Sequence, residues 1–84
     1  MKAKAKKRTV RHTKHYFTVI LEPDEPGYHA FCPALPGCNT CGDTFEETMK
    51  NIRQAAKVYC VSLVKHGEPL PVEDYLFTTI AVSL

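Results

Sequence analysis

Hydrophobic positions alternate with a period of two near both ends of the chain and with a helical period in its middle. Residues 16–22 are rich in aromatic and β-branched side chains, and Phe17, Val19 and Leu21 share one face of an extended segment. The other face is also largely apolar. This pattern predicts a strand that lies inside a sheet or against a partner.

Two further strands are predicted after the first one. Residues 23–27 are turn-forming, and the extended pattern resumes over 28–32. Together they predict a β-hairpin with a loop of about five residues. Residues 38–41 predict a short third strand.

A long helix is predicted to begin after Asp43 or Thr44, either of which can cap it. Thr44 and Glu47 have the spacing of a capping box, and Gly67 is the expected left-handed residue beyond the last turn. Apolar residues recur every three or four positions and predict a stripe that faces a sheet: Phe45, Met49, Ile52, Ala56, Tyr59 and Leu63.

Residues 75–84 alternate again and predict a final strand with one apolar face. Such a strand needs an edge with which to pair. It would either close the sheet of its own chain or add to the sheet of another subunit. The pattern as a whole predicts an α+β domain of order β-β-β-α-β, in which an antiparallel sheet of three to four strands packs on one long helix.

Charge divides the chain into a basic arm, residues 1–15, and an acidic domain, residues 16–84. The arm has seven basic residues and no acid, whereas the domain has four basic residues against nine acids, a net charge of −5. Such an arm is either a solvated segment or a contact for nucleic acid or for an acidic surface. The candidate contacts are Lys4, Lys6, Lys7, Arg8 and Arg11.

The length of 84 residues allows one domain with a modest core, so we expect a homodimer or a higher homo-oligomer. No apolar run is long enough to cross a bilayer, and the basic arm lacks the apolar stretch of a secretory signal. We therefore expect a cytoplasmic protein that does not enter a membrane.

The connector between the second extended segment and the helix has a distinctive order of turn residues. Its pattern is Pro33-x-Leu35-Pro36-Gly37-Cys38-x-Thr40-x-Gly42-Asp43-Thr44-x-Glu46-Glu47. Together with Glu22-Pro23, Gly27-Tyr28 and the exit Gly67-x-Pro69-x-Pro71, it closely resembles the HicB family of antitoxins over residues 16–74. We regard the connector residues as structural.

The resemblance implies a partial RNase H-like fold without its catalytic carboxylates. It also implies a partner, a small basic mRNA-cleaving toxin of the HicA type, whose active site the antitoxin covers. Many HicB-like proteins carry a C-terminal DNA-binding domain of ribbon-helix-helix or helix-turn-helix type. These 84 residues include none, so repression of its own operon would depend on the basic arm.

Catalytic and metal-binding alternatives are less well supported by the residues. An RNase H-type enzyme needs several carboxylates that converge on metal ions, and Asp43 is better explained as a helix cap. Cys32, Cys38 and Cys41 with His29 could supply four zinc ligands. There is one close cysteine pair, however, and in a reducing cytoplasm the thiols are expected to be free.

We therefore predict a protein with no enzymatic activity, no cofactor and no metal, which acts as an antitoxin-like protein-binding module. The alternative is a small nucleic-acid-binding regulator that uses the basic arm as its anchor.

Overall fold

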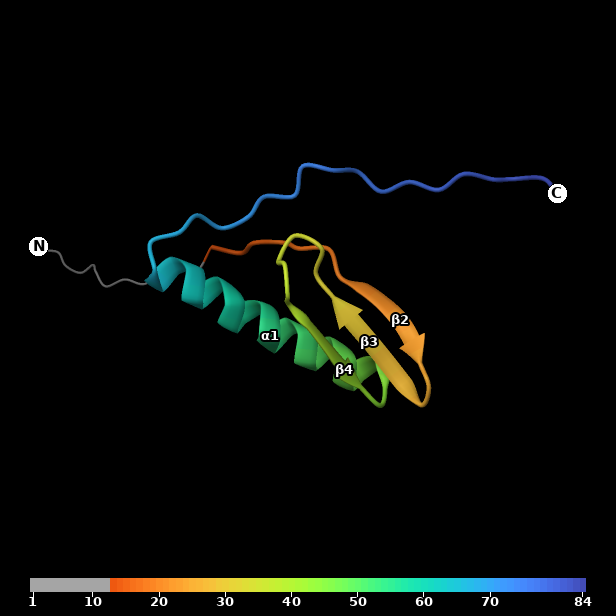
Figure 1. Cartoon of the computed structure of the whole chain (residues 1–84), viewed down its shortest axis with the longest axis horizontal. Coiled ribbons are helices and arrows are strands. Elements are labelled where there is room, and N and C mark those ends of the chain that lie inside the picture. The colour runs from red at the N-terminus through yellow and green to blue at the C-terminus, as the bar shows by residue number, and fades with distance from the viewer. Residues whose placement is uncertain (1–12) are drawn as a thin grey trace, which may run out of the picture.

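The computed structural model describes residues 13–84, which form three antiparallel strands followed by one long helix (Figure 1). The sheet contains β2 (Ile20–Asp24), β3 (Gly27–Phe31) and β4 (Asn39–Gly42), in that order. The helix α1 (Phe45–Lys65) packs against β3 and β4. This arrangement confirms the predicted α+β class, with a three-stranded antiparallel sheet and one long helix.

The hairpin that joins β2 to β3 is tighter than the sequence predicted. Asp24 pairs with Gly27, so the turn consists of Glu25 and Pro26, which are joined by a cis peptide bond. The strand continues through Pro23 because β2 is an edge strand, where a missing N–H is tolerated. The prediction of a loop of about five residues was therefore wrong.

β2 also begins later than residue 16. Its first pair joins Ile20 to Phe31, the last residue of β3. The next backbone N–H, that of Cys32, donates to the carbonyl oxygen of Cys38 at 3.1 Å and so leaves the ladder. Residues 16–19 consequently pair with no strand among the described residues.

The core lies between the sheet and α1. Leu21, Ala30 and Thr40 form one row across the three strands, and Ala30 is fully buried. From the helix, Ile52 is buried against this face, which stabilises the fold by about 1.5–3 kcal/mol for one such side chain. Phe17, Val19 and Leu21 all pack on the core, as the alternation predicted.

Both ends of α1 are capped. The Oγ1 of Thr44 accepts the N–H of Glu47 at 3.0 Å, and Glu47 Oε1 accepts the N–H of Asp43 at 2.7 Å. At the other end Gly67 has a φ of 70°, and the N–H of Glu68 donates to the carbonyl oxygen of Leu63 at 2.9 Å. This is a Schellman ending. Within residues 13–84, no helix is both long and apolar enough to cross a membrane.

The final strand predicted over residues 75–84 is not formed within this chain. Residues 68–84 have neither helix nor strand, and Figure 1 shows an extended segment that first passes along the body and then projects away from it. A strand requires a neighbour with which to exchange backbone hydrogen bonds, and residues 75–84 project from the body without one. The order of elements in residues 13–84 is therefore β-β-β-α.

Candidate protein-binding surface

The connector from Cys32 to Cys38 is a compact bend that closes on itself. The N–H of Leu35 donates to the carbonyl oxygen of Cys32 at 3.0 Å, and the N–H of Cys38 donates to that of Leu35 at 2.9 Å. Leu35 and Cys38 are both buried, and Gly37 has a φ of 84°. These residues shape the chain and fill the core, which agrees with a structural role.

Gly27 and Gly42 bring the hairpin turn against the start of α1. A Cβ on Gly42 would meet Thr48 Oγ1 at 2.6 Å, and a Cβ on Gly27 would meet the carbonyl oxygen of Gly42 at 2.0 Å. Beside them, the rings of Tyr28 and Phe45 meet edge to face with their centroids 6.4 Å apart. The β2–β3 turn and the first turn of α1 therefore share one end of the molecule.

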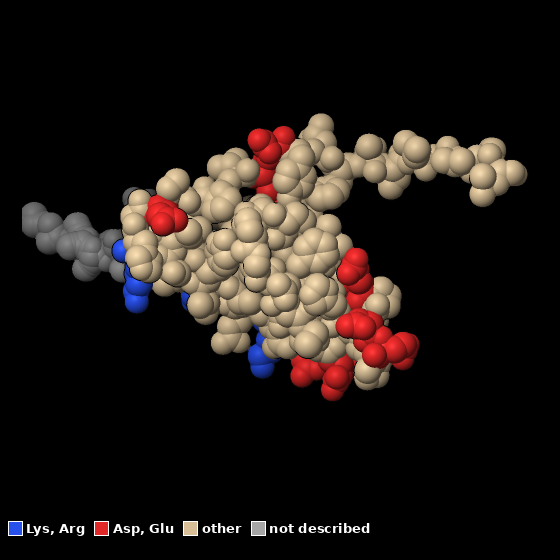
Figure 2. Space-filling view, in the orientation of Figure 1, with Lys and Arg blue, Asp and Glu red and all other residues tan. Residues whose placement is uncertain are grey.

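This shared end is strongly acidic. Figure 2 shows acidic side chains gathered where the β2–β3 turn and the start of α1 meet. Six of the nine acids of the chain are exposed there, and we call this surface the acidic end: Glu22, Asp24, Glu25, Asp43, Glu46 and Glu47.

Little positive charge lies within the acidic end. For residues 13–84, the one ionic contact to its carboxylates within 4.0 Å is that of His29 Nδ1 with Glu22 Oε1, at 3.8 Å. A negative surface of this kind attracts basic partners and raises their rate of encounter.

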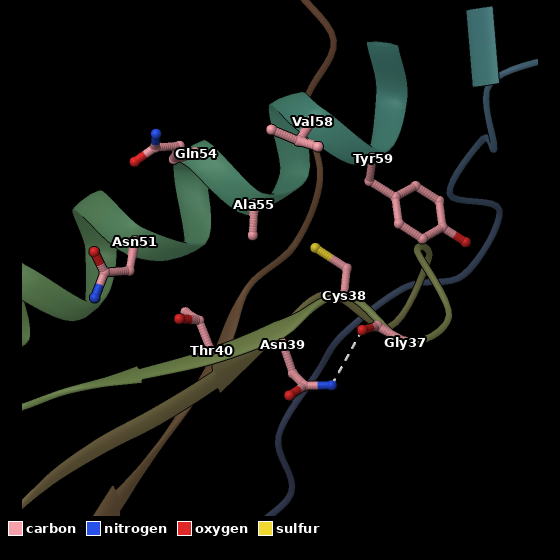
Figure 3. Close-up of a pocket in the computed structure, with 9 residues that line it drawn as sticks. All are labelled: Gly37, Cys38, Asn39, Thr40, Asn51, Gln54, Ala55, Val58 and Tyr59. Carbon is pink, nitrogen blue, oxygen red and sulfur yellow. Dashed lines mark hydrogen bonds between the residues drawn. The ribbon is translucent and has the colours of Figure 1, made fainter. Parts of the chain in front are cut away.

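A second surface feature is the groove between β4 and α1, which has a volume of about 480 Å³ (Figure 3). Two of its polar side chains are hydrogen-bonded to the backbone. Asn39 Nδ2 donates to the carbonyl oxygen of Gly37 at 3.2 Å, and Asn51 Nδ2 donates to that of Cys41 at 3.0 Å. Cys38 points towards α1 and is buried. The groove can receive a side chain of a partner, but it presents no activated nucleophile.

Comparison with known families agrees with this geometry. The HicB_like antitoxin of bacterial toxin-antitoxin systems matches residues 16–81, which include the whole sheet, the connector and α1. The chain belongs to the HicB-like antitoxin family. The resemblance read from the connector is thereby confirmed.

Similar proteins occur in bacteria, archaea and a phage. A UPF0150 protein of Synechocystis sp. is 45% identical over 67 residues, which cover 79% of this chain and 85% of that protein. A UPF0150 protein of Thermoplasma acidophilum is 48% identical over 56 residues, covering 66% and 81%. An uncharacterised 14.9 kDa protein of Haemophilus phage HP1 is 30% identical over 64 residues, covering 71% of this chain and 48% of its own length.

The cysteines of this HicB-like chain do not converge on one point. Cys32 and Cys38 are buried, and burial together with the neighbouring Cys38 raises the pKa of Cys32 to about 11. Burial also raises the pKa of Cys60. Cys41, in contrast, is exposed and pairs with His29 across the sheet. Each of these residues is next to a member of the core-facing pair Ala30 and Thr40, so both point to the other face of the sheet.

No zinc site is formed from these cysteines in the structure. In the part of the chain that is described, no three His, Cys, Asp or Glu side chains are placed to hold a metal ion. The reason is the alternation of β4, which sends Cys41 to the sheet face away from Cys38.

Other candidate residues have mixed outcomes. Thr44, and not Asp43, is the helix cap, while Asp43 is exposed at the acidic end. The arm residues Lys4, Lys6, Lys7, Arg8 and Arg11 lie outside the described residues, so their contact with nucleic acid stays a prediction. The boundary between arm and domain at residue 15 also stays a prediction.

One important position was missed from the sequence. Thr48 is fully buried beside Gly42, and its Oγ1 donates to the carbonyl oxygen of Thr44 at 2.7 Å. A threonine in a helix interior can satisfy its hydroxyl in this way. The spacing of Thr44 and Thr48 by one helical turn was the available signal.

Proposed function

We propose that this HicB-like chain is an antitoxin that binds a small basic mRNA-cleaving toxin of the HicA type and covers its active site. Membership of the antitoxin family supports this role. The observation that carries it for this particular chain is the acidic end. On this proposal the protein acts in the cytoplasm by occlusion and has no enzymatic activity of its own.

The chemistry of the partner explains why an acidic surface is useful. A ribonuclease that binds mRNA must present positive charge to the phosphates, and exposed carboxylates can meet the same positive charge. Charge complementarity of this kind mainly increases the association rate and the specificity. The acidic end therefore contributes more to the speed of capture than to the final affinity.

Binding to a purified HicA-type toxin would test the proposal. We expect the wild-type chain to form a complex and to stop cleavage of mRNA by the toxin. Glu25→Lys should lower the association rate at low salt by about tenfold, because it reverses a charge in the exposed turn of the acidic end. Raising the salt concentration should shrink this difference.

The matched control is Glu68→Lys. Glu68 is equally exposed, but it follows the other end of α1, so the same change in net charge occurs away from the acidic end. Equal effects of the two variants would show that the acidic end is not the docking surface. Absence of any complex, or continued cleavage within the complex, would contradict the antitoxin function itself.

A second candidate function is nucleic-acid binding through residues 1–15, and the seven basic residues of the arm favour it. Replacing Lys6, Lys7 and Arg8 with alanine in the full chain should then weaken binding to RNA or duplex DNA and reduce its salt dependence. Unchanged binding would exclude the arm as the anchor.

A further inference from the structure

The segment of residues 76–84, which we call the C-terminal segment, exposes an unusual amount of apolar surface. Leu76 is 96% exposed, Ile80 83% and Val82 68%. The segment contains no charged residue, and Figure 2 shows it projecting from the body with no other part of the chain around it. Contiguous apolar surface of this kind marks an interaction site on a soluble protein.

The conformation of this segment is that of a strand without a partner. It is extended in Figure 1, and it takes part in no sheet of its own chain. Tyr75 and Phe77, two positions apart, meet edge to face with their ring centroids 5.3 Å apart, so they share one side of the backbone. Its peptide groups are therefore available for pairing with another edge.

An edge suited to such a strand exists at β2. β2 pairs with β3 on one side, and among residues 13–84 no strand lies on its other side. The residues that precede β2 contain Phe17 and Val19, on the face that packs towards the core. Residues 16–22 include no proline, so no backbone N–H is missing from this part of the edge.

A groove lies on the helix side of this edge. α1 contacts β3 and β4 but not β2, and the groove lies beside the residues that lead into β2. The groove has a volume of about 410 Å³ and lies between residues 15–19 and α1. Its apolar lining includes Phe17, Val19, Met49, Ala56 and Cys60.

An anchor places the start of the C-terminal segment at this same edge. The backbone N–H of Thr18 donates to Glu73 Oε2, and Thr18 Oγ1 donates to Glu73 Oε1 at 2.9 Å. The chain then leaves the body, so within residues 13–84 each copy presents an unpaired apolar segment after Glu73 and an unpaired β2 edge beyond Thr18, with a groove beside that edge. Exchange between two copies satisfies both at once, as in domain swapping.

We propose that the C-terminal segment of one copy pairs as an added strand with the β2 edge of a second copy and packs its apolar side chains into the groove there. The exchange is reciprocal and gives a closed two-fold dimer. Main-chain hydrogen bonds hold the strand, and the groove selects apolar side chains at alternate positions. The oligomer expected from the small size of the domain is thereby given a specific interface.

Sedimentation velocity of the full chain over a range of concentrations tests this dimer. We expect a dimer for the wild type, and we expect Ile80→Asp to weaken dimerisation by about a hundredfold, because it would bury an unpaired charge. Ile80 is exposed in the single chain, so its replacement leaves the fold of the monomer intact. Val58→Asp is the matched control, since Val58 is 64% exposed on α1 beside the other groove.

Hydrogen exchange supplies the second readout. In the dimer the amides of residues 76–84 and of residues 17–22 should be protected together, and both should lose protection on dilution or in Ile80→Asp. A wild type that is monomeric at all concentrations would overturn the proposal. So would protection of residues 76–84 in the monomer, or an equal loss of dimer in Val58→Asp. None of these measurements involves a toxin, so they fail or succeed independently of the antitoxin function.

Discussion

A methyl group on Gly27 would lie 2.0 Å from the carbonyl oxygen of Gly42. The same methyl group would lie 2.8 Å from the Cα of Asp43. Both neighbours are backbone atoms, which cannot rotate aside as a side chain can. This contact holds the β2–β3 turn against the start of α1, and it thereby assembles the acidic end from two distant parts of the sequence.

Gly27→Ala should therefore destabilise the fold by about 3 kcal/mol or more, because the backbone must shift to admit the methyl group. Urea unfolding followed by circular dichroism would measure the change. Gly67→Ala is the comparison, because nothing lies within 4 Å of its Cβ position and its cost, about 1 kcal/mol, comes from the φ of 70°. Equal losses in the two variants would contradict the close packing at Gly27.

Thr44→Ala should cost about 1 kcal/mol of stability, since it removes the oxygen that accepts the N–H of Glu47. The measurement is again the free energy of unfolding in urea. Ser62→Ala provides the control at an exposed position within α1. There, alanine should be neutral or slightly stabilising because of its higher helix propensity. A Thr44→Ala variant as stable as the wild type would rule out the cap.

Stability should fall as the pH rises from about 9 to about 11. Burial raises the pKa of Cys32 from its ordinary 9.0 to about 11, so the unfolded chain loses this proton at a lower pH than the folded chain does. The neutral thiol therefore makes its full contribution to the free energy of unfolding below pH 9, and this contribution is lost as the pH rises through 11.

Urea unfolding at pH 8 and pH 10.5 would measure this loss. Cys32→Ala should show a smaller fall between the two pH values than the wild type, whatever its starting stability. Cys41→Ala, which removes an exposed thiol, should retain the wild-type fall. The same fall in Cys32→Ala as in the wild type would exclude Cys32 as the group responsible.

The thiols should also differ in their rate of reaction with Ellman's reagent. Cys41 is exposed and should react about tenfold faster, or more, than Cys32 and Cys38, which must wait for the fold to open. Cys41→Ser should remove the fast phase, and urea should merge all phases into one. A fast phase that survives in Cys41→Ser would show that Cys41 is not the most reactive thiol, and the partly buried Cys60 would be the next to replace.

Local signals in the sequence were sufficient for α1. The capping pair of Thr44 and Glu47, the apolar stripe and the final Gly67 all act within a few residues of one another, and the helix begins and ends where they predict. The face of the first strand was equally readable, because alternation assigns Phe17 and Leu21 to one side.

Strand ends were less predictable. Whether Pro23 lies in a turn or in a strand depends on whether its strand is at an edge, and that is a property of the whole sheet. The start of β2 likewise depends on Cys32, whose N–H turns away to Cys38. The relation of the cysteines has a similar dependence, since Cys41 is close to Cys38 in sequence but lies on the opposite face of the sheet.

The sequence by itself determined the family, the α+β class and the long capped helix, because these depend on short-range spacing and on the period of apolar residues. The tertiary structure alone decided where distant residues meet. It gathered the acids of the hairpin turn and of the helix start at one end through the contact of Gly27 with Gly42. It also left residues 76–84 without a strand partner among the described residues. A strand pattern specifies that pairing is needed, but the available edge is set by the packing of all the other elements.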